Sequence, residues 1–148
     1  MKLLIALCAA DELKAKRKLW LHDLSLSNIR LAAYAALVET VYLTKQPLGN
    51  EAQAAQDKYG IMTLRVKHIA IADHGIDMQF KGVSGKQTSI AIPAATHTKL
   101  VAVYQMLMKD KVAESELFTV GGKPIPLVLV NRYLYGLGID TALQHFGK

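Results

Sequence analysis

Cysteine and aromatic residues are scarce in this sequence, and each scarcity excludes something. Cys8 is the single cysteine among 148 residues, so no disulfide can form within the chain. Aromatic residues make up 7%, so the core is predicted to consist mainly of leucine, isoleucine, valine and alanine. The five histidines are His22, His68, His74, His97 and His145. None of them pairs at the spacing of a helical or zinc-finger ligand set, so we predict neither a metal site nor a cofactor.

Long apolar runs are also missing. The chain begins MKLLIALCAADE, which superficially resembles a signal peptide. Its apolar run, Leu3 to Ala10, is short for a signal and far too short to cross a membrane. We therefore expect a retained and buried first element, and a protein of the cytoplasm or of a virion that is not secreted.

What the sequence does contain is enough apolar material for one folded domain. Hydrophobic residues make up 51% and charged residues 20%, and the length suits a single domain. We predict an N-terminal helical segment over residues 1–24 and a core over residues 25–148. The net charge of +6 permits contact with nucleic acid, and it equally fits a solvated basic surface.

Helical periodicity covers most of the chain. Apolar residues recur at helical spacing over about residues 29–41, 94–110 and 127–137, and one or two helical pieces are predicted over 3–21. A short helix is predicted over 50–58, and a final turn reaches Phe146. Ser25 or Ser27 suits the N-cap of the second helix, Asn50 that of the short one, and Asp140 or Thr141 that of the last turn.

Three strands are predicted in the middle of the chain. Apolar and polar residues alternate over 61–71, 76–81 and 88–92, and short turns separate these segments. Strands joined by tight turns form an antiparallel meander. The predicted fold class is therefore α+β and mostly helical, with helices packed around a three-stranded antiparallel sheet.

Five motifs in this order resemble one family. They are Gly49-Asn50-Glu51; the run from Gly60 through Thr63-Leu64-Arg65 to His68; Phe80 to Lys86; Glu114 to Phe118; and Asn131, Tyr133 and Leu134. Their order and spacing resemble the catalytic domain of type IB DNA topoisomerases. The resemblance runs from about Ser25 to the C-terminus and implies the fold of that domain.

The resemblance also implies where catalytic residues should lie. Family members attack a phosphodiester with a tyrosine, while two arginines and a histidine or lysine stabilise the charge and another lysine protonates the leaving oxygen. The first arginine position holds Pro47, the lysine position Val83, and the second arginine position falls near Phe146 or Gly147. The nucleophilic tyrosine would come later still. We therefore predict a pseudoenzyme with no catalytic residue.

Neighbouring residues offer only partial substitutes. Lys81 and Lys86 flank the missing lysine, and Lys45 is near the missing arginine, but an ammonium lacks the bidentate guanidinium fork. Tyr133 and Tyr135 precede the family's nucleophile position. The helices that follow in the family would cover part of the core. We therefore expect an open apolar face that binds a partner protein or a second copy of the chain.

Three functions follow as hypotheses. The first is a structural or protein-interaction component, by analogy of a virus or mobile element. The second is a catalytically dead DNA-binding module that contacts backbone phosphates without sequence preference. Its candidate residues are Lys14, Lys16, Arg17, Lys18, Arg65, Lys67, Lys81 and Lys86. The third is one subunit of a split topoisomerase. This hypothesis is the weakest of the three, because the missing arginine and lysine should lie on this half of the enzyme.

Overall fold

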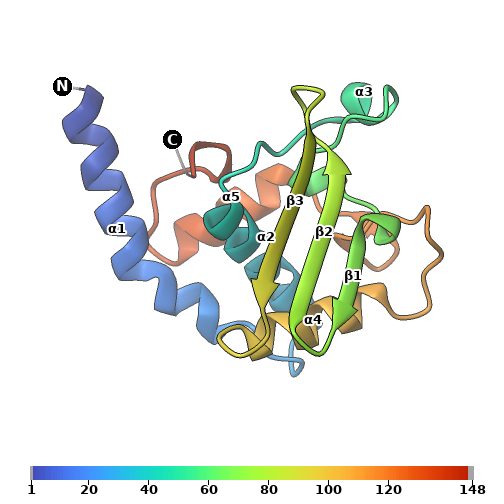
Figure 1. Cartoon of the computed structure of the whole chain (residues 1–148). Coiled ribbons are helices and arrows are strands. Elements are labelled where there is room, and N and C mark those ends of the chain that lie inside the picture. Colours follow the sequence, from blue (N-terminus) through green and yellow to red (C-terminus); the bar gives the residue numbers. More distant parts are fainter. Residues whose placement is uncertain (1, 147–148) are drawn as a thin grey trace.

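A three-stranded sheet stands in front of a group of helices in the computed structural model of the chain (Figure 1). The structure describes the backbone of residues 2–146 and the side chains of residues 12–146. The helices are α1 (Lys2–His22), α2 (Ile29–Thr44), α3 (Glu51–Ala54), α4 (Thr98–Met108) and α5 (Leu127–Gly136). The strands are β1 (Ile69–Ala72), β2 (Gly75–Lys81), β3 (Gln87–Pro93), β4 (Thr119–Val120) and β5 (Lys123–Pro124). The predicted α+β class is confirmed.

Helix α2 is the centre of the molecule. Every residue from Ala32 to Val41 is buried, and α1, α4 and α5 all pack against it. Its many alanines allow this because small side chains let neighbouring backbones approach closely. The helix begins at Asn28, whose side chain accepts a hydrogen bond from the Leu31 amide. The predicted caps Ser25 and Ser27 were wrong, since these two serines bond to each other in the preceding turn.

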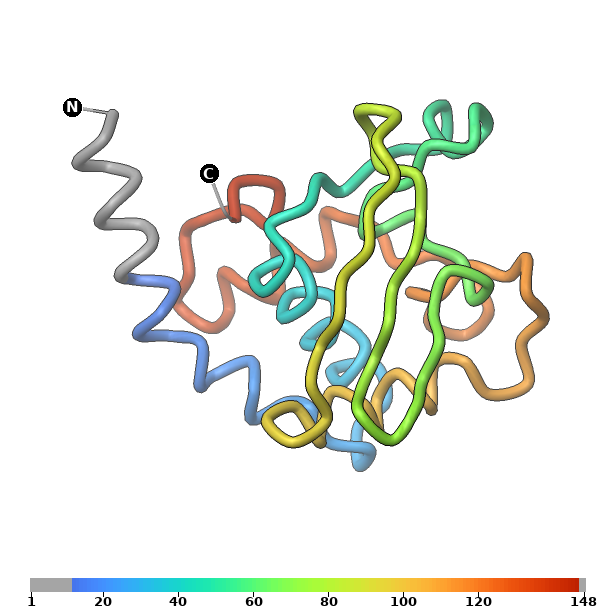
Figure 2. The backbone as a smooth tube through the Cα atoms, viewed as in Figure 1, coloured from blue at the N-terminus to red at the C-terminus, as the bar shows by residue number. Residues whose placement is uncertain are grey.

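The sheet is the predicted antiparallel meander, in the order β1-β2-β3. The central strand β2 buries Ile76, Met78 and Phe80 against the helices, which confirms the alternation predicted from the sequence. Its Met78 pairs with Ile69 of β1 on one side and with Ile90 of β3 on the other. The β2–β3 hairpin projects beyond the body of the molecule near α3 (Figure 2).

The prediction of a strand over residues 61–71 was largely wrong. Only β1 is a strand, and it follows two short 3₁₀ turns, η1 (Ile61–Thr63) and η2 (Val66–His68). The Ile61 and Met62 amides donate to the carbonyl oxygens of Pro47 and Leu48, both at 2.9 Å, instead of to a neighbouring strand. A contact between backbones, which the alternating pattern does not encode, decides this conformation.

Smaller differences concern the ends of elements. Helix α3 is shorter than predicted, although Asn50 does cap it by accepting from the Gln53 amide at 2.9 Å. The last turn, η3 (Leu143–His145), begins after Ala142 instead of after Asp140 or Thr141. The β4–β5 hairpin was not predicted. Within the described residues, no helix has both the length and the apolar character to cross a membrane.

Helix α1 runs unbroken to His22, so one helix forms where the sequence allowed one or two. Leu13 and Trp20 are buried, and the helix packs against α2. The prediction that Leu3 to Ala10 is buried concerns side chains outside those described.

Candidate functional site

A hollow of about 510 Å³ lies between the loop after α2 and the β2–β3 hairpin. We call it the hairpin hollow. Its walls are Gln46, Pro47, Gly82, Val83, Ser84, Lys86, Gln87, Thr88 and Ser89. Pro47 and Val83 are far apart in the sequence, and the fold brings both positions to one space. The resemblance placed an arginine and a proton-donating lysine at these two positions. In an active member of that family, these two side chains would therefore lie together at the hairpin hollow.

A second hollow, of about 270 Å³, adjoins the first and shares Gln46 and Pro47 with it. Phe146 is among its lining residues, and it is a buried side chain that packs against Trp20 with ring centroids 5.8 Å apart. The second arginine was expected near Phe146 or Gly147. An apolar ring therefore fills the first of these positions, and Gly147 lies outside the described residues.

Positive charge is sparse around these hollows. Lys86 is the one cation among the lining residues of the hairpin hollow, all of which lie in the described part of the chain. Lys45 lines the second hollow, but its ammonium lies 4.8 Å from the centre of the Tyr42 ring and donates to the Tyr42 carbonyl oxygen at 3.2 Å. Neither lysine supplies the bidentate fork with which arginine binds a phosphate.

The Gly49-Asn50-Glu51 motif has a structural role here. Gly49 has a φ of +76° and packs so closely on Gly60 that a side chain on either residue would overlap the other backbone. Asn50 caps α3, and Glu51 lies in its first turn, where a carboxylate is favourable against the helix dipole. The motif therefore shapes the loop that carries Pro47.

Arg65 and Lys67, two candidate DNA contacts, bind a carboxylate of the same chain. The Arg65 guanidinium donates to the Glu114 carbonyl oxygen at 3.1 Å, and the Lys67 ammonium donates to the Glu114 carboxylate at 3.1 Å. The ring of His68, in the same motif, packs against the Tyr59 ring at a tilt of 56°, with 4.3 Å between the ring centroids. Burial lowers the pKa of His68, and its Nδ1 accepts a hydrogen bond from the Arg65 amide at 3.0 Å.

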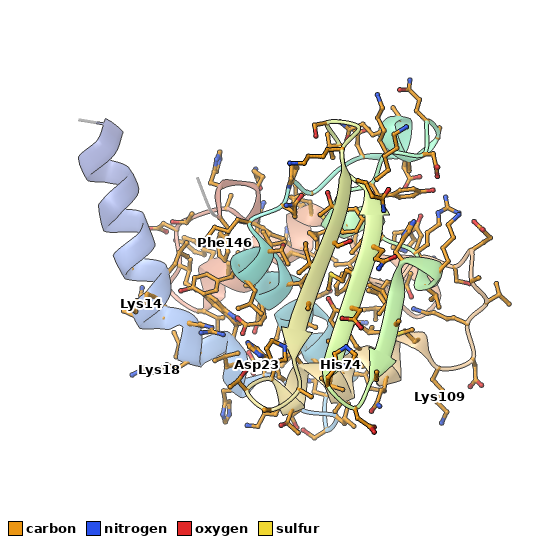
Figure 3. The ribbon with its side chains drawn as sticks, viewed as in Figure 1. Lys14, Lys18, Asp23, His74, Lys109 and Phe146 are labelled. Atoms are coloured by element: carbon orange, nitrogen blue, oxygen red, sulfur yellow. The ribbon has the colours of Figure 1, made fainter. Side chains whose placement is uncertain are left out.

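Of the four candidate residues on α1, two are bound within the chain and two are exposed. Arg17 binds the buried carboxylate of Glu39, which is 1% exposed, and the Glu39 hydrogen bond raises the pKa of Arg17. Lys16 donates to the Gly138 carbonyl oxygen. Lys14 and Lys18 are exposed and lie along α1 (Figure 3).

Lys81 and Lys86 are exposed on the hairpin, away from α1 (Figure 1). The eight candidate cations thus form no single surface, and four of them are engaged by groups of the same chain.

Sequence reasoning missed the buried polar cluster around Glu39. Its carboxylate accepts from the Arg17 guanidinium at 2.5 and 3.0 Å and from the Trp20 indole at 3.1 Å. A signal was available, because a glutamate within an apolar, alanine-rich helix must find partners if it is buried.

The two tyrosines near the C-terminus lack the surroundings of a nucleophile. The Tyr133 hydroxyl donates to the Asp23 carboxylate at 2.5 Å, and burial raises the pKa of the Tyr133 hydroxyl above its ordinary value. Tyr135 is exposed on the other side of α5. Neither hydroxyl is hydrogen-bonded to a lysine, arginine or histidine within the described residues.

Comparison with known proteins agrees with this fold. The model of the family described as eukaryotic DNA topoisomerase I, catalytic core, matches residues 9–141. The chain therefore belongs to this family, as its five motifs indicated. No curated protein matches the sequence.

Proposed function

We propose that this protein is a non-catalytic member of the topoisomerase I family that serves as a structural or protein-interaction component. One observation carries the proposal: Pro47 and Val83 lie together in the hairpin hollow, where the family's chemistry requires a guanidinium and an ammonium. A pyrrolidine ring and an isopropyl group can neither stabilise charge on a phosphate nor donate a proton.

The size of the electrostatic loss supports an inert site. Removal of one preorganised donor from a developing anion typically slows catalysis by about 10²–10³-fold. Here two such positions are neutral, and the third falls near Phe146, a buried ring, or Gly147, which lies outside the described residues. Lys86 alone cannot replace these groups, since nucleophilic chemistry needs its supporting residues together.

A second feature supports a role in protein contacts. Helix α5 exposes Val128 and Tyr135, which are 62% and 71% accessible and lie seven residues apart, with the exposed Arg132 between them. Seven residues are two helical turns, so these side chains share one face. Tyrosine and arginine are enriched where proteins bind one another, and an exposed valine adds apolar area to such a face.

Relaxation of supercoiled plasmid DNA tests the loss of catalysis. We expect no relaxed product even with one protein molecule per few hundred base pairs, and none after the substitutions Pro47→Arg and Val83→Lys are made together. Relaxation by the unaltered chain would overturn the proposal, because the hairpin hollow would then support catalysis despite its neutral walls.

Light scattering over a range of concentrations tests the interaction role. We expect self-association that weakens when Val128 and Tyr135 are both changed to serine. Val112→Ser is the matched control, because Val112 is 71% exposed but lies in the loop after α4. A strict monomer, or equal effects of all substitutions, would contradict association through α5.

One observation favours a second candidate function, sequence-tolerant binding of DNA. Lys81 and Lys86 are exposed on the β2–β3 hairpin, and the Lys58 side chain reaches to about 4.0 Å from the position of a Cβ on Gly85. Three ammonium groups around one hairpin could contact backbone phosphates. A split topoisomerase ranks last, since the positions of the arginine and lysine lie on this chain.

A further inference from the structure

Basic side chains that the proposed function leaves unused line a different cavity. It has a volume of about 500 Å³ and lies between the C-terminal half of α1 and the loop that joins β3 to α4. These two segments meet below the sheet, away from the β2–β3 hairpin (Figure 1). We call this cavity the α1–α4 pocket. Nothing in the proposed function uses it.

Basic side chains converge on the α1–α4 pocket from two elements. Lys18 and His22 come from α1, and His97 and Lys99 come from the segment that begins α4. His97 is oriented by its own surroundings, because its Nδ1 lies 2.8 Å from the Thr96 hydroxyl and 3.1 Å from the Pro93 carbonyl oxygen, which leaves Nε2 available. Two ammonium groups and two imidazoles therefore share one concave space.

The acidic residue at this pocket does not cancel the positive charge. Glu39 borders the cavity, but its side chain is buried and its carboxylate already accepts from Arg17 and Trp20. Arg17 and Glu39 together contribute no net charge. Lys18 and Lys99, both exposed, have no acidic partner within 4.0 Å among the described residues.

The remaining walls combine two threonines, Thr96 and Thr98, with apolar side chains. Leu21, Leu24 and Leu100 line the cavity, and Leu24 and Leu100 are buried. Ligand pockets commonly have volumes of about 300–1,000 Å³ and combine an apolar lining with a few converging polar groups. The α1–α4 pocket has this composition, with cations among its polar groups.

We propose that the α1–α4 pocket binds a small organic anion, whose phosphate or carboxylate contacts Lys18 and Lys99 and whose apolar body lies on the leucine wall. Ammonium groups give charge-assisted hydrogen bonds to anions, the stronger class of hydrogen bond in proteins. The leucines add burial of apolar surface. The site would bind its ligand independently of the hairpin hollow and of the α5 face.

Titration of backbone amide NMR signals tests this proposal with three probes of similar body: phenyl phosphate, benzoate and the neutral benzyl alcohol. We expect saturable shifts for residues 17–22 and 95–100 with one or both anions, and much weaker ones with benzyl alcohol. The relative affinities of phenyl phosphate and benzoate then identify the preferred head group.

The variant Lys18→Gln/Lys99→Gln should weaken binding by about tenfold or more, the scale of one charge-assisted hydrogen bond. Both lysines are exposed, so the fold should tolerate the change. The matched control is Lys81→Gln/Lys86→Gln, which removes the same charge from the hairpin and should leave the affinity unchanged.

Three results would overturn the proposal. They are an absence of shifts at millimolar probe, equal binding of benzyl alcohol, and equal effects of the two double variants. A short DNA duplex serves as a further probe. If the duplex binds through Lys18 and Lys99 while phenyl phosphate does not, the pocket is part of a nucleic-acid surface and does not bind a small anion.

Discussion

Among individual residues, Glu39 has the most demanding position. It is the one acidic side chain in the middle of α2, and it is 1% exposed. A buried carboxylate is expensive unless its oxygens are paired. Arg17 and Trp20, both on α1, provide that pairing, so the polar cluster fixes how α1 lies on α2. Arg17 was expected to contact DNA, and the structure assigns it this internal role instead.

The substitution Arg17→Met should therefore destabilise the protein by about 2–3 kcal/mol. Breaking a fully buried pair costs about 3–5 kcal/mol, and the loss here is smaller because the Arg17 side chain is 31% exposed. Methionine keeps most of the apolar length of arginine. Urea unfolding followed by circular dichroism measures the difference in free energy.

The double variant Arg17→Met/Glu39→Gln provides the control. Glutamine removes the unpaired charge and can still accept from Trp20, so much of the lost stability should return. If the two single losses simply add in the double variant, Arg17 and Glu39 are not coupled and this interpretation is wrong.

At the scale of elements, the crossing of Gly49 and Gly60 determines the path of the chain. A Cβ on Gly60 would lie 2.3 Å from both the Gly49 nitrogen and the Leu48 carbonyl carbon. These are backbone atoms, which cannot move aside as the end of a side chain can. The crossing holds η1 against the loop that carries Pro47, and it explains why residues 61–63 form a turn instead of a strand.

We expect Gly60→Ala to destabilise the protein by about 1–3 kcal/mol, the usual cost of overpacking. Gly136→Ala is the matched control, because Gly136 ends α5 with no atom within 4 Å of the new Cβ. That change should be neutral or should stabilise by up to about 1 kcal/mol, since alanine is the better helix former. Thermal unfolding of both variants measures the difference, and equal losses would contradict the steric explanation.

The sequence predicted the elements whose pattern is local. Ile76, Met78 and Phe80 alternate and are buried, and Leu100, Val103, Tyr104 and Leu107 recur along α4 and are buried as well. Prediction from the sequence failed where contacts between distant segments determine the conformation, as in η1. For the site, the motifs predicted that positions 47 and 83 lack the arginine and lysine of the family. Only the fold revealed that they share one hollow and that Arg17 pairs with Glu39.

For the whole molecule, the arrangement of charge matters more than the total of +6. Lys14 and Lys18 lie along α1, Lys81 and Lys86 are on the hairpin, and Arg65 and Lys67 are bound to Glu114. Cations that are dispersed or internally paired give weak attraction to a duplex, because few of them can reach its phosphates at once.

Binding to a short labelled duplex across a salt series tests this arrangement. We expect weak binding that is lost near physiological salt. The variant Lys81→Gln/Lys86→Gln should lower the slope of log affinity against log salt by about two, one for each phosphate contact. Lys14→Gln/Lys18→Gln should leave the slope unchanged. Binding that is still tight at physiological salt, and that weakens steeply as more salt is added, would contradict the proposed structural role and favour the DNA-binding module.

The neutral walls of the hairpin hollow also have a consequence for evolution. An enzyme that gathers several cations around an empty phosphate site bears their mutual repulsion, a common form of the trade-off between stability and activity. Under the proposed non-catalytic role, the neutral side chains of Pro47 and Val83 would spare the chain that repulsion. The stability gained in this way would allow more substitutions elsewhere on its surface.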